Sequence, residues 1–156
     1  VDIRVRLVGG TDEKNPAAID QLTLDDWRAE GIVDVAGPST DVAGEYARAH
    51  IAVLPSYREG LPKSLLEGAA AGRPIVATDV PGCREICRDD ETGILVPVRT
   101  VEPLAAALER LAGDAALRSR LGAGARTAAV KELSEEIVVT QTLDLYRDML
   151  TNQPAD

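Results

Sequence analysis

The sequence predicts an α/β fold, in which helices cover both faces of a parallel β-sheet. Short runs rich in Val and Ile alternate along the chain with longer segments whose apolar residues repeat at helical spacing. The short runs are apolar throughout, which is typical of strands buried on both faces. The connections are short, as in repeated β-α-β units. We therefore expect a Rossmann-like parallel sheet of five or six strands, followed by C-terminal helices.

The alternating part of the chain predicts strands and helices in a fixed order. The expected strands are Arg4–Val8, Ile32–Ala36, Ile51–Leu54, Ile75–Thr78 and Gly93–Val96. The expected helices span residues 15–30, 41–49, 62–72 and 82–88. Parallel strands connected in this way require right-handed crossovers, which place the helices against the sheet.

The chain after Val96 shows only helical patterns. Apolar residues at helical spacing lie at Leu104, Leu108, Leu111, Leu117 and Leu121. The segment Gly122-Ala123-Gly124 follows no strand and lacks the third glycine of a dinucleotide-binding loop. We interpret it as a break between helices.

A last helix is predicted over Ser134–Leu150. Its apolar residues follow the spacing i, i+4, i+7, i+11 at Val139, Leu143, Tyr146 and Leu150. Ser134 suits the N-cap, and acidic residues in the first turn favour the helix dipole. Residues 1–150 then form one domain, and residues 151–156 form a disordered tail.

Composition excludes several classes of protein. The chain has 156 residues, with 17 basic and 26 acidic side chains and a net charge of −9, so we expect no nucleic-acid partner. One His and two Cys are too few for a usual zinc site, and no Asp-x-Asp occurs, so we expect no metal and no cofactor. Cys83 and Cys87 are interpreted as reduced cysteines of a cytosolic protein. No apolar run reaches the roughly 20 residues of a membrane span.

The segment after the third expected strand is the candidate site, because ligands of parallel sheets bind at the carboxyl ends of the strands. Gly60 lets the backbone approach a ligand, and Pro62 suits the first turn of the next helix. The free amides of Leu61, Lys63 and Ser64, together with the helix dipole, predict an anion site that suits phosphate.

Two carboxylates flank this anion site. Glu59 precedes the expected helix, and Glu67 lies about one and a half turns into it. From the loop and from the helix, both can face one cleft and accept hydrogen bonds from the hydroxyls of a ribose and a sugar. Considered by their charge alone, the two glutamates are more typical of a solvated surface. It is the whole segment around them that favours a binding site.

The whole segment resembles a known family. It begins as PSYREGLP at residues 55–62 and continues as EGAAAGRPIVATDVPGCREI from Glu67, with TGILV at residues 92–96. This string resembles the Glu-x7-Glu signature of the family-4 retaining glycosyltransferases, which have the two-domain GT-B fold. The resemblance runs from about residue 4 to residue 150. Gly68 stands where the family usually has Ala, and Cys83 stands at a common second Gly.

The resemblance implies roles for the residues of this motif. Glu59 would bind the hydroxyls of the donor sugar and is the candidate catalytic residue. Gly60, Leu61 and Lys63 would offer backbone amides near the sugar and the phosphates, with Pro62 between them. Glu67 would bind the ribose hydroxyls of the nucleotide.

Two further segments enter the predicted site through the resemblance. Val35, Ala36 and Gly37 correspond to the place where the family holds the base by its backbone. Gly9 and Gly10 correspond to a glycine-rich turn near the nucleotide, and a plain tight turn is the alternative for them.

The resemblance also concerns the last expected helix, Ser134–Leu150. In the GT-B fold the C-terminal helices reach back towards the other domain. We therefore expect this helix to be the most mobile element and its apolar stripe to pack against a neighbouring molecule.

The resemblance also implies parts that these residues do not contain. The family usually carries an Arg and a Lys on the first strand–helix loop of this domain, and Lys14 lies in the wrong element to replace them. That unit and an N-terminal acceptor domain are expected upstream, so we interpret the chain as a fragment. The implied function is the donor-binding half of an enzyme that transfers a sugar from a nucleotide sugar, most commonly linked to UDP. The expected acceptor is a polyprenyl-linked glycan or a polysaccharide of the cell envelope, and the expected location is the cytoplasm or the inner membrane face.

Two other functions compete with this interpretation. The first is a nucleotide-binding or interaction module without transferase activity, which only the activity of the full-length protein separates from an enzyme. The second is a flavodoxin-like receiver domain. A receiver requires a phospho-acceptor Asp after the third strand. This chain has Leu54-Pro55-Ser56 there, so the receiver interpretation fails.

Overall fold

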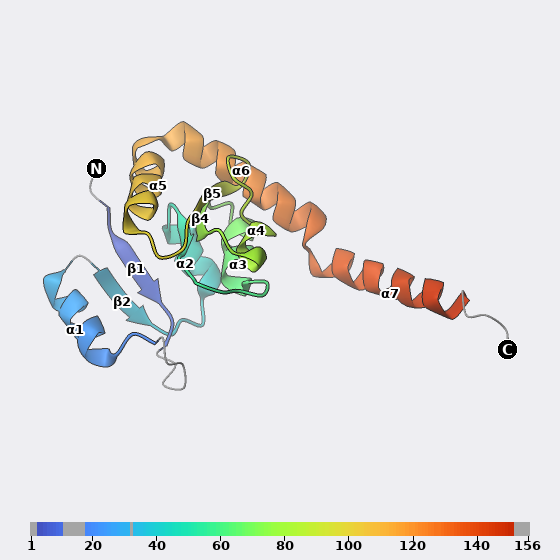
Figure 1. Cartoon of the computed structure of the whole chain (residues 1–156), viewed down its shortest axis with the longest axis horizontal. Helices are drawn as coiled ribbons and strands as arrows, with labels where there is room; N and C mark the ends of the chain where they lie inside the picture. Colours follow the sequence, from blue (N-terminus) through green and yellow to red (C-terminus); the bar gives the residue numbers. More distant parts are fainter. Residues whose placement is uncertain (1–2, 11–17, 32, 152–156) are drawn as a thin grey trace. The chain divides into compact units, whose positions relative to one another are not determined.

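The computed structural model of the chain describes residues 3–10, 18–31 and 33–151 (Figure 1). The chain divides into two compact units, Val1–Glu45 and Tyr46–Asp156. We call them the N-terminal unit and the C-terminal unit and describe each by itself. Lys14 lies outside the described residues.

The N-terminal unit contains a two-stranded parallel sheet. Its elements are β1 (Val5–Val8), α1 (Gln21–Glu30), β2 (Val33–Gly37) and the start of α2 (Val42–Arg48). β1 and β2 pair in parallel, with a register shift between Leu7 and Val8. Arg6 connects the unit across its surface, because its guanidinium pairs with Asp34 and with a carboxylate oxygen of Glu45, the latter at 2.8 Å. No described residue of this unit is buried.

The first helix begins later than expected. Residues 18–20 are not helical, and Asp20 is the N-cap of α1. The Asp20 carboxylate accepts a 2.8 Å hydrogen bond from the backbone amide of Thr23, and Gly31 ends the helix in the left-handed conformation. This aspartate satisfies an amide that the first helical turn leaves free, so the helix starts after it rather than at residue 15.

The C-terminal unit is built on a three-stranded parallel sheet of order β3-β4-β5. Its elements are β3 (Ala52–Leu54), α3 (Lys63–Ala70), β4 (Ile75–Thr78), α4 (Pro81–Arg84), β5 (Gly93–Val96), α5 (Val101–Gly113), α6 (Ala115–Glu132) and α7 (Glu135–Thr151). The central strand β4 is buried along its whole length. The strands and the helices that pack on them can be followed in Figure 1.

Helices cover both faces of this sheet, as expected. Successive side chains of β4 point to opposite faces. Ile75 and Ala77 belong to one buried cluster, which also includes Leu65 of α3 and Ala125 of α6. Val76 belongs to a second cluster on the other face, made by α5 and α6. The α/β class and the C-terminal helices are therefore confirmed, while the five described strands form two sheets rather than one.

The expected helix break at Gly122-Ala123-Gly124 is wrong. α6 continues without interruption through these residues. A Cβ on Gly122 would lie 2.3 Å from the carbonyl oxygen of Gly72, and a Cβ on Gly124 would lie 2.2 Å from that of Glu91. The two glycines therefore allow α6 to pack directly against two backbone turns. Sequence reasoning mistook a close approach for a helix end.

Two other boundaries differ from the expectation. The helix expected over residues 82–88 is the short α4, which ends at Arg84, and the amide of Arg88 donates to the hydroxyl of Thr92 at 2.7 Å. The last helix runs on to Thr151, which the sequence pattern places in the tail, and residues 152–156 lie outside the described part. No described helix combines the length and the apolar character that crossing a membrane requires.

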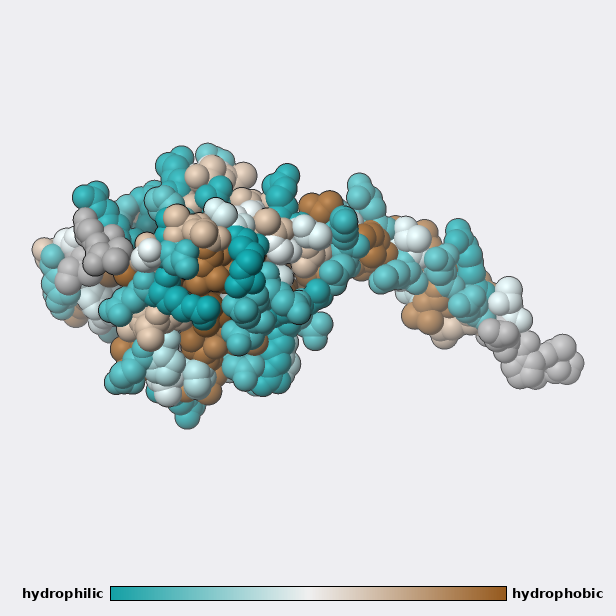
Figure 2. Space-filling view, turned by 90° about the horizontal axis from the view of Figure 1, so that it is seen from above, coloured by the Kyte–Doolittle hydropathy of each residue, from teal (hydrophilic) through white to brown (hydrophobic). Residues whose placement is uncertain are grey.

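The last helix buries none of its side chains. All of its apolar residues from Val138 to Leu150 are exposed. Apolar surface is visible along the helix in the space-filling view (Figure 2). The expected stripe is therefore present, and its packing partner and its mobility stay predictions.

Candidate functional site

The loop between β3 and α3 is fixed to the neighbouring strand. β3 and β4 are parallel neighbours, so their carboxyl ends lie at the same edge of the sheet. The hydroxyl of Thr78, the last residue of β4, donates a hydrogen bond to the carbonyl oxygen of Ser56. Thr78 is 3% exposed. The loop with the candidate residues is thus anchored where parallel sheets bind ligands.

A second anchor of this loop is Gly82, at the start of α4. A Cβ on Gly82 would lie 1.8 Å from the carbonyl oxygen of Gly60 and 2.7 Å from that of Glu59. No side chain fits between these backbones. The close packing defines the position of Glu59 and Gly60 relative to the sheet.

The N-terminus of α3 presents free backbone donors. Pro62 is the N-cap, with a ψ of 113°, and not the first helical residue as expected. Its carbonyl oxygen accepts from the amides of Leu65 and Leu66 at 3.1 and 3.2 Å. Within the described residues, no hydrogen-bond partner occupies the amides of Lys63 or Ser64. These amides, together with the helix dipole, make an anion-binding position.

Glu67 lies one turn beyond these amides. Its side chain is 35% exposed, and its carboxylate lies 3.6 Å from the ammonium of Lys63. The phenol of Tyr46 donates a 2.6 Å hydrogen bond to the carbonyl oxygen of Ser64. Burial, and then the charge of Glu67, raise the pKa of Tyr46. Tyr46 thus keeps its proton and holds the first turn of α3 beside Glu67.

Gly68 is explained by the same tyrosine. A Cβ at position 68 would lie 2.8 Å from the Cβ of Ala52 and 3.1 Å from the Tyr46 ring. Alanine, the residue expected here from the family resemblance, would require a shift of α3 against β3. The departure at Gly68 therefore matches the local packing.

The half-buried Glu59 acts electrostatically on Cys83, one of the two cysteines. Burial, and then the charge of Glu59, raise the pKa of Cys83. Burial, and then the charge of Asp89, raise the pKa of Cys87 to about 12. Both thiols are free and fully buried. They pack in the core beneath the site and have the low reactivity of protonated thiols.

The other candidate residues come together within the N-terminal unit. The amide of Gly9 donates to the carbonyl oxygen of Gly37 at 2.9 Å, and both glycines have positive φ, 144° and 73°. Gly10 lies against Pro38. These residues end β1 and β2 at one edge, where the turn itself requires glycine. The carbonyl oxygen of Val35 accepts from Arg28 at 3.4 Å.

Sequence reasoning missed several residues that shape the site. Thr78 and Tyr46 act through hydrogen bonds to backbone oxygens, for which the sequence offers no separate signal. Arg99 lies over the ring of Tyr57, with its guanidinium carbon 5.4 Å from the ring centre. Arg99 lies three residues after the carboxyl end of β5, and this position is the one signal that the sequence offered for it.

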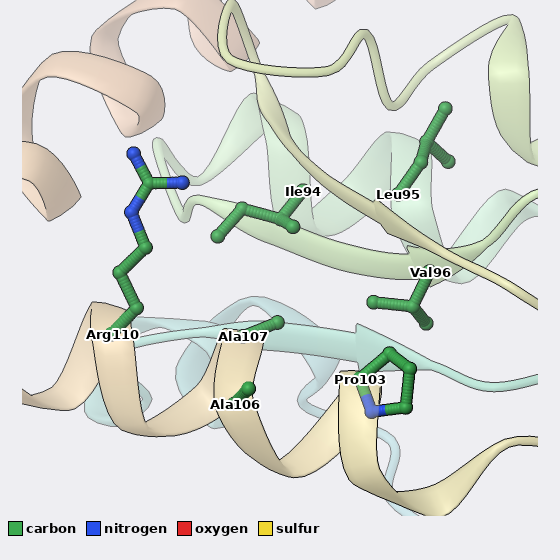
Figure 3. A pocket seen from close by; sticks show the side chains of 7 residues that line it. All are labelled: Ile94, Leu95, Val96, Pro103, Ala106, Ala107 and Arg110. Atoms are coloured by element: carbon green, nitrogen blue, oxygen red, sulfur yellow. The ribbon is translucent and has the colours of Figure 1, made fainter.

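A separate pocket lies between β5 and α5 (Figure 3). Its volume is about 290 Å³, and its lining is Ile94, Leu95, Val96, Pro103, Ala106, Ala107 and Arg110. Val96 lies close to Pro103 at one end, and Arg110 extends from α5 at the other. It contains none of the candidate site residues. Among the residues that the structure describes, no three His, Cys, Asp or Glu side chains group as metal ligands.

Comparison with known proteins identifies the class that this fold and loop define. The sequence model of the family described as group 1 glycosyl transferases matches residues 1–114. The chain therefore belongs to the group 1 glycosyltransferases, which is the class predicted from the motif at residues 55–67. The retaining stereochemistry remains a prediction.

Two relatives are much longer than the segment that they share with this chain. An exopolysaccharide phosphotransferase of Streptomyces coelicolor is 40% identical over 123 residues, which cover 78% of this chain and 13% of that protein. An N,N'-diacetylbacillosaminyl-diphospho-undecaprenol α-1,3-N-acetylgalactosaminyltransferase of Campylobacter jejuni is 33% identical over 146 residues, covering 94% and 37%. The chain thus spans less than two-fifths of either relative.

Solved structures share the fold. Sucrose-phosphate synthase from Thermosynechococcus elongatus matches with a TM-score of 0.82 at 27% identity, covering 96% of this chain and 39% of that one. The Anabaena protein HepE, solved in complex with UDP, matches with a TM-score of 0.84 at 17% identity, covering 94% and 41%. The second likeness concerns the fold alone.

Proposed function

We propose that this chain is the donor-binding part of a retaining glycosyltransferase that takes a sugar from a nucleotide sugar. The observation that carries the proposal is the α3 N-terminus, where free amides lie between Glu59 and Glu67 in an anchored loop. In the proposed complex, the amides bind the diphosphate, Glu59 accepts from the sugar hydroxyls and Glu67 accepts from the ribose hydroxyls.

The proposed reaction depends on position and charge. The bond between the sugar and the diphosphate breaks as the acceptor hydroxyl attacks from the same face of the sugar, and the proton of the hydroxyl passes to the departing diphosphate. The helix dipole and the amides stabilise the diphosphate as it leaves. Because this arrangement needs no cation, we expect transfer by the full-length enzyme to persist in EDTA. If EDTA abolished the activity and manganese restored it, the proposal that transfer needs no metal would be contradicted.

The partners are proposed by analogy with relatives. The Anabaena protein HepE binds UDP in its crystal structure, which supports a UDP-linked donor. The Campylobacter relative is named for an undecaprenol-linked substrate, which supports a lipid-linked or polysaccharide acceptor. We propose that the enzyme works in the cytoplasm, at or near the inner membrane face.

The family resemblance supports two further parts of the whole protein. We propose that a strand–helix unit with a basic loop, and an acceptor domain, belong to the enzyme in addition to these 156 residues. Both parts are proposed from the resemblance of residues 55–96 to the group 1 glycosyltransferases.

The test uses the full-length protein and a panel of nucleoside diphosphates and sugar nucleotides in calorimetry. Glu67→Ala is expected to weaken nucleotide binding by about 1.5–3 kcal/mol, the value of a charge-assisted hydrogen bond. The matched control is Glu109→Ala, at an exposed position of α5. Unchanged affinity in Glu67→Ala would remove its assignment. The 156 residues alone are expected to fold and transfer no sugar, and robust transfer by them would contradict the proposed division between domains.

A further inference from the structure

Arg99 occupies an unusual backbone conformation beside the candidate site. It lies in the loop that joins β5 to α5, with a φ of 60°, and among the described residues only Asp90 shares a positive φ without being glycine. Side chains other than glycine rarely adopt this conformation, and such strain concentrates at functional sites. The loop follows the carboxyl end of β5, the same edge of the sheet at which residues 55–62 lie.

The side chain of Arg99 is held by Tyr57. Its guanidinium carbon lies 5.4 Å from the centre of the Tyr57 ring, within the range of a cation–π contact. Tyr57 is 62% exposed and lies two residues before Glu59. Its neighbour Ser56 is anchored to Thr78 through its carbonyl oxygen. The contact therefore places a cation against the anchored loop that carries the proposed donor site.

The charge of Arg99 is not compensated within the described part of the chain. No described carboxylate lies within ion-pair distance of it, whereas Arg84, Arg88 and Arg120 each pair with one. The ammonium of Lys63, the basic residue of α3, lies 3.6 Å from the carboxylate of Glu67. In a chain of net charge −9, an exposed and uncompensated guanidinium at this edge is therefore suited to bind an anion.

We propose that Arg99, oriented by Tyr57, binds the diphosphate of the nucleotide-sugar donor and contributes to its selection. This inference rests on the proposed function. The planar guanidinium offers five donors in a fork that matches two phosphate oxygens at once. Diphosphate is the part of the donor that carries charge, and the free amides of α3 already favour it at this edge. Stacking on Tyr57 leaves the edge of the guanidinium available for these bonds.

The experiment compares diphosphate binding with nucleoside binding in the full-length enzyme. Arg99→Gly removes the side chain and suits the positive φ, so the fold is kept. We expect its affinity for UDP to fall about tenfold or more, the affinity for uridine to change less than about twofold, and the melting temperature to stay equal or rise. Tyr57→Leu is expected to give a smaller loss in the same direction. Arg120→Gln, which removes a guanidinium paired with Asp90 before β5, is the control.

The outcomes separate this contact from the proposed function. If Arg99→Gly bound UDP as well as the wild type, the contact would be excluded. An equal loss of affinity for UDP and for uridine would assign Arg99 a structural role. That result would also exclude its contact with the diphosphate. If the wild-type enzyme bound no nucleoside diphosphate, the proposed function would be wrong, and the contact of Arg99 that rests on it would be wrong as well. A rise in the donor KM with little change in kcat would support the contact independently.

Discussion

In the C-terminal unit β4 is buried along its whole length, whereas in the N-terminal unit neither β1 nor β2 has a buried residue. Both units contain the same parallel strand pairing and an amphipathic helix. The C-terminal unit, however, has helices on both faces of three strands, and the N-terminal unit has two strands and leaves Val5, Val8 and Leu22 exposed. The comparison teaches that β-α-β connectivity alone does not produce a core, because a parallel sheet is stable only when both faces are covered.

The largest expected effect is on folding after the chain is cut before α2. We expect residues 40–156 to unfold cooperatively on heating, because they contain both buried clusters. Residues 1–39 are expected to remain unfolded alone, since a two-stranded sheet is marginal in water. Circular dichroism and the dispersion of amide NMR signals measure both. A dispersed NMR spectrum from residues 1–39 would show that this segment folds alone and would contradict the comparison of the two units.

The next effect concerns one leucine from each unit. Leu121 of α6 is 0% exposed and Leu22 of α1 is 78% exposed. Leu121→Ala is expected to lower the free energy of unfolding by about 2–5 kcal/mol, because it leaves a cavity in the core. Leu22→Ala is expected to stay within about 0.5 kcal/mol. Urea unfolding curves of the two variants measure the free energy of unfolding. If both variants lost a similar amount of it, Leu22 would be buried in solution and the contrast between the units would fail.

A smaller effect is expected for two glycines of the C-terminal unit. Gly82→Ala would force the Gly60 carbonyl away from α4, at a cost of about 1–3 kcal/mol for overpacking. Gly60→Ala has no atom within 4 Å of the new Cβ and is the matched control for stability. Because the displaced loop carries Glu59, Gly82→Ala should also weaken nucleotide binding by the full-length enzyme. Normal stability with normal binding would show that the backbones separate without cost.

The same contrast explains which parts of the fold could be predicted from the sequence. The strands of the C-terminal unit were found nearly to the residue, because β4 and β5 are short apolar runs in a sheet covered on both faces. The α/β class followed from that pattern. The division into two sheets did not follow, since strand order depends on neighbours that a run of Val and Ile does not encode.

The candidate site shows a different limit of the sequence. The motif located Glu59, Gly60 and Glu67, and the structure places them on one anchored loop and helix. The sequence could not show that Gly82 packs on Gly60, or that Arg99 lies over Tyr57, because these contacts join loops that are distant along the chain. The error at Gly122 has the same origin, since a glycine required by a distant backbone looks like a local helix end.

Two equivalent helix caps sharpen the comparison further. Asp20 caps α1 and Asp114 caps α6, each through a 2.8 Å hydrogen bond from the amide three residues on. Asp114→Ala is expected to lower the free energy of unfolding by about 1 kcal/mol, because α6 belongs to the core. Asp20→Ala should unravel the start of α1 and leave the global transition unchanged. Hydrogen exchange distinguishes local from global opening, and a global loss from Asp20→Ala would contradict the independence of the units.

The smallest expected effect is the response to acid. The Thr23 amide and hydroxyl hold the pKa of Asp20 below its ordinary value of 3.8, and Arg88 holds the pKa of Glu132 below 4.5. A lowered pKa means that the folded state favours the charged carboxylate. The stabilisation is therefore complete above the ordinary value and is lost as the pH falls through the lowered one. Protonation of Glu132 should lower the melting temperature of the C-terminal unit, because its partner Arg88 precedes β5 while Glu132 ends α6. Protonation of Asp20 should loosen only α1. Calorimetric melting between pH 6 and pH 3 should thus show a smaller acid dependence in Glu132→Gln and an unchanged one in Asp20→Asn. If instead the acid dependence became smaller in Asp20→Asn and stayed unchanged in Glu132→Gln, the acid-sensitive contact would lie in the N-terminal unit. That unit would then contribute to the global unfolding transition.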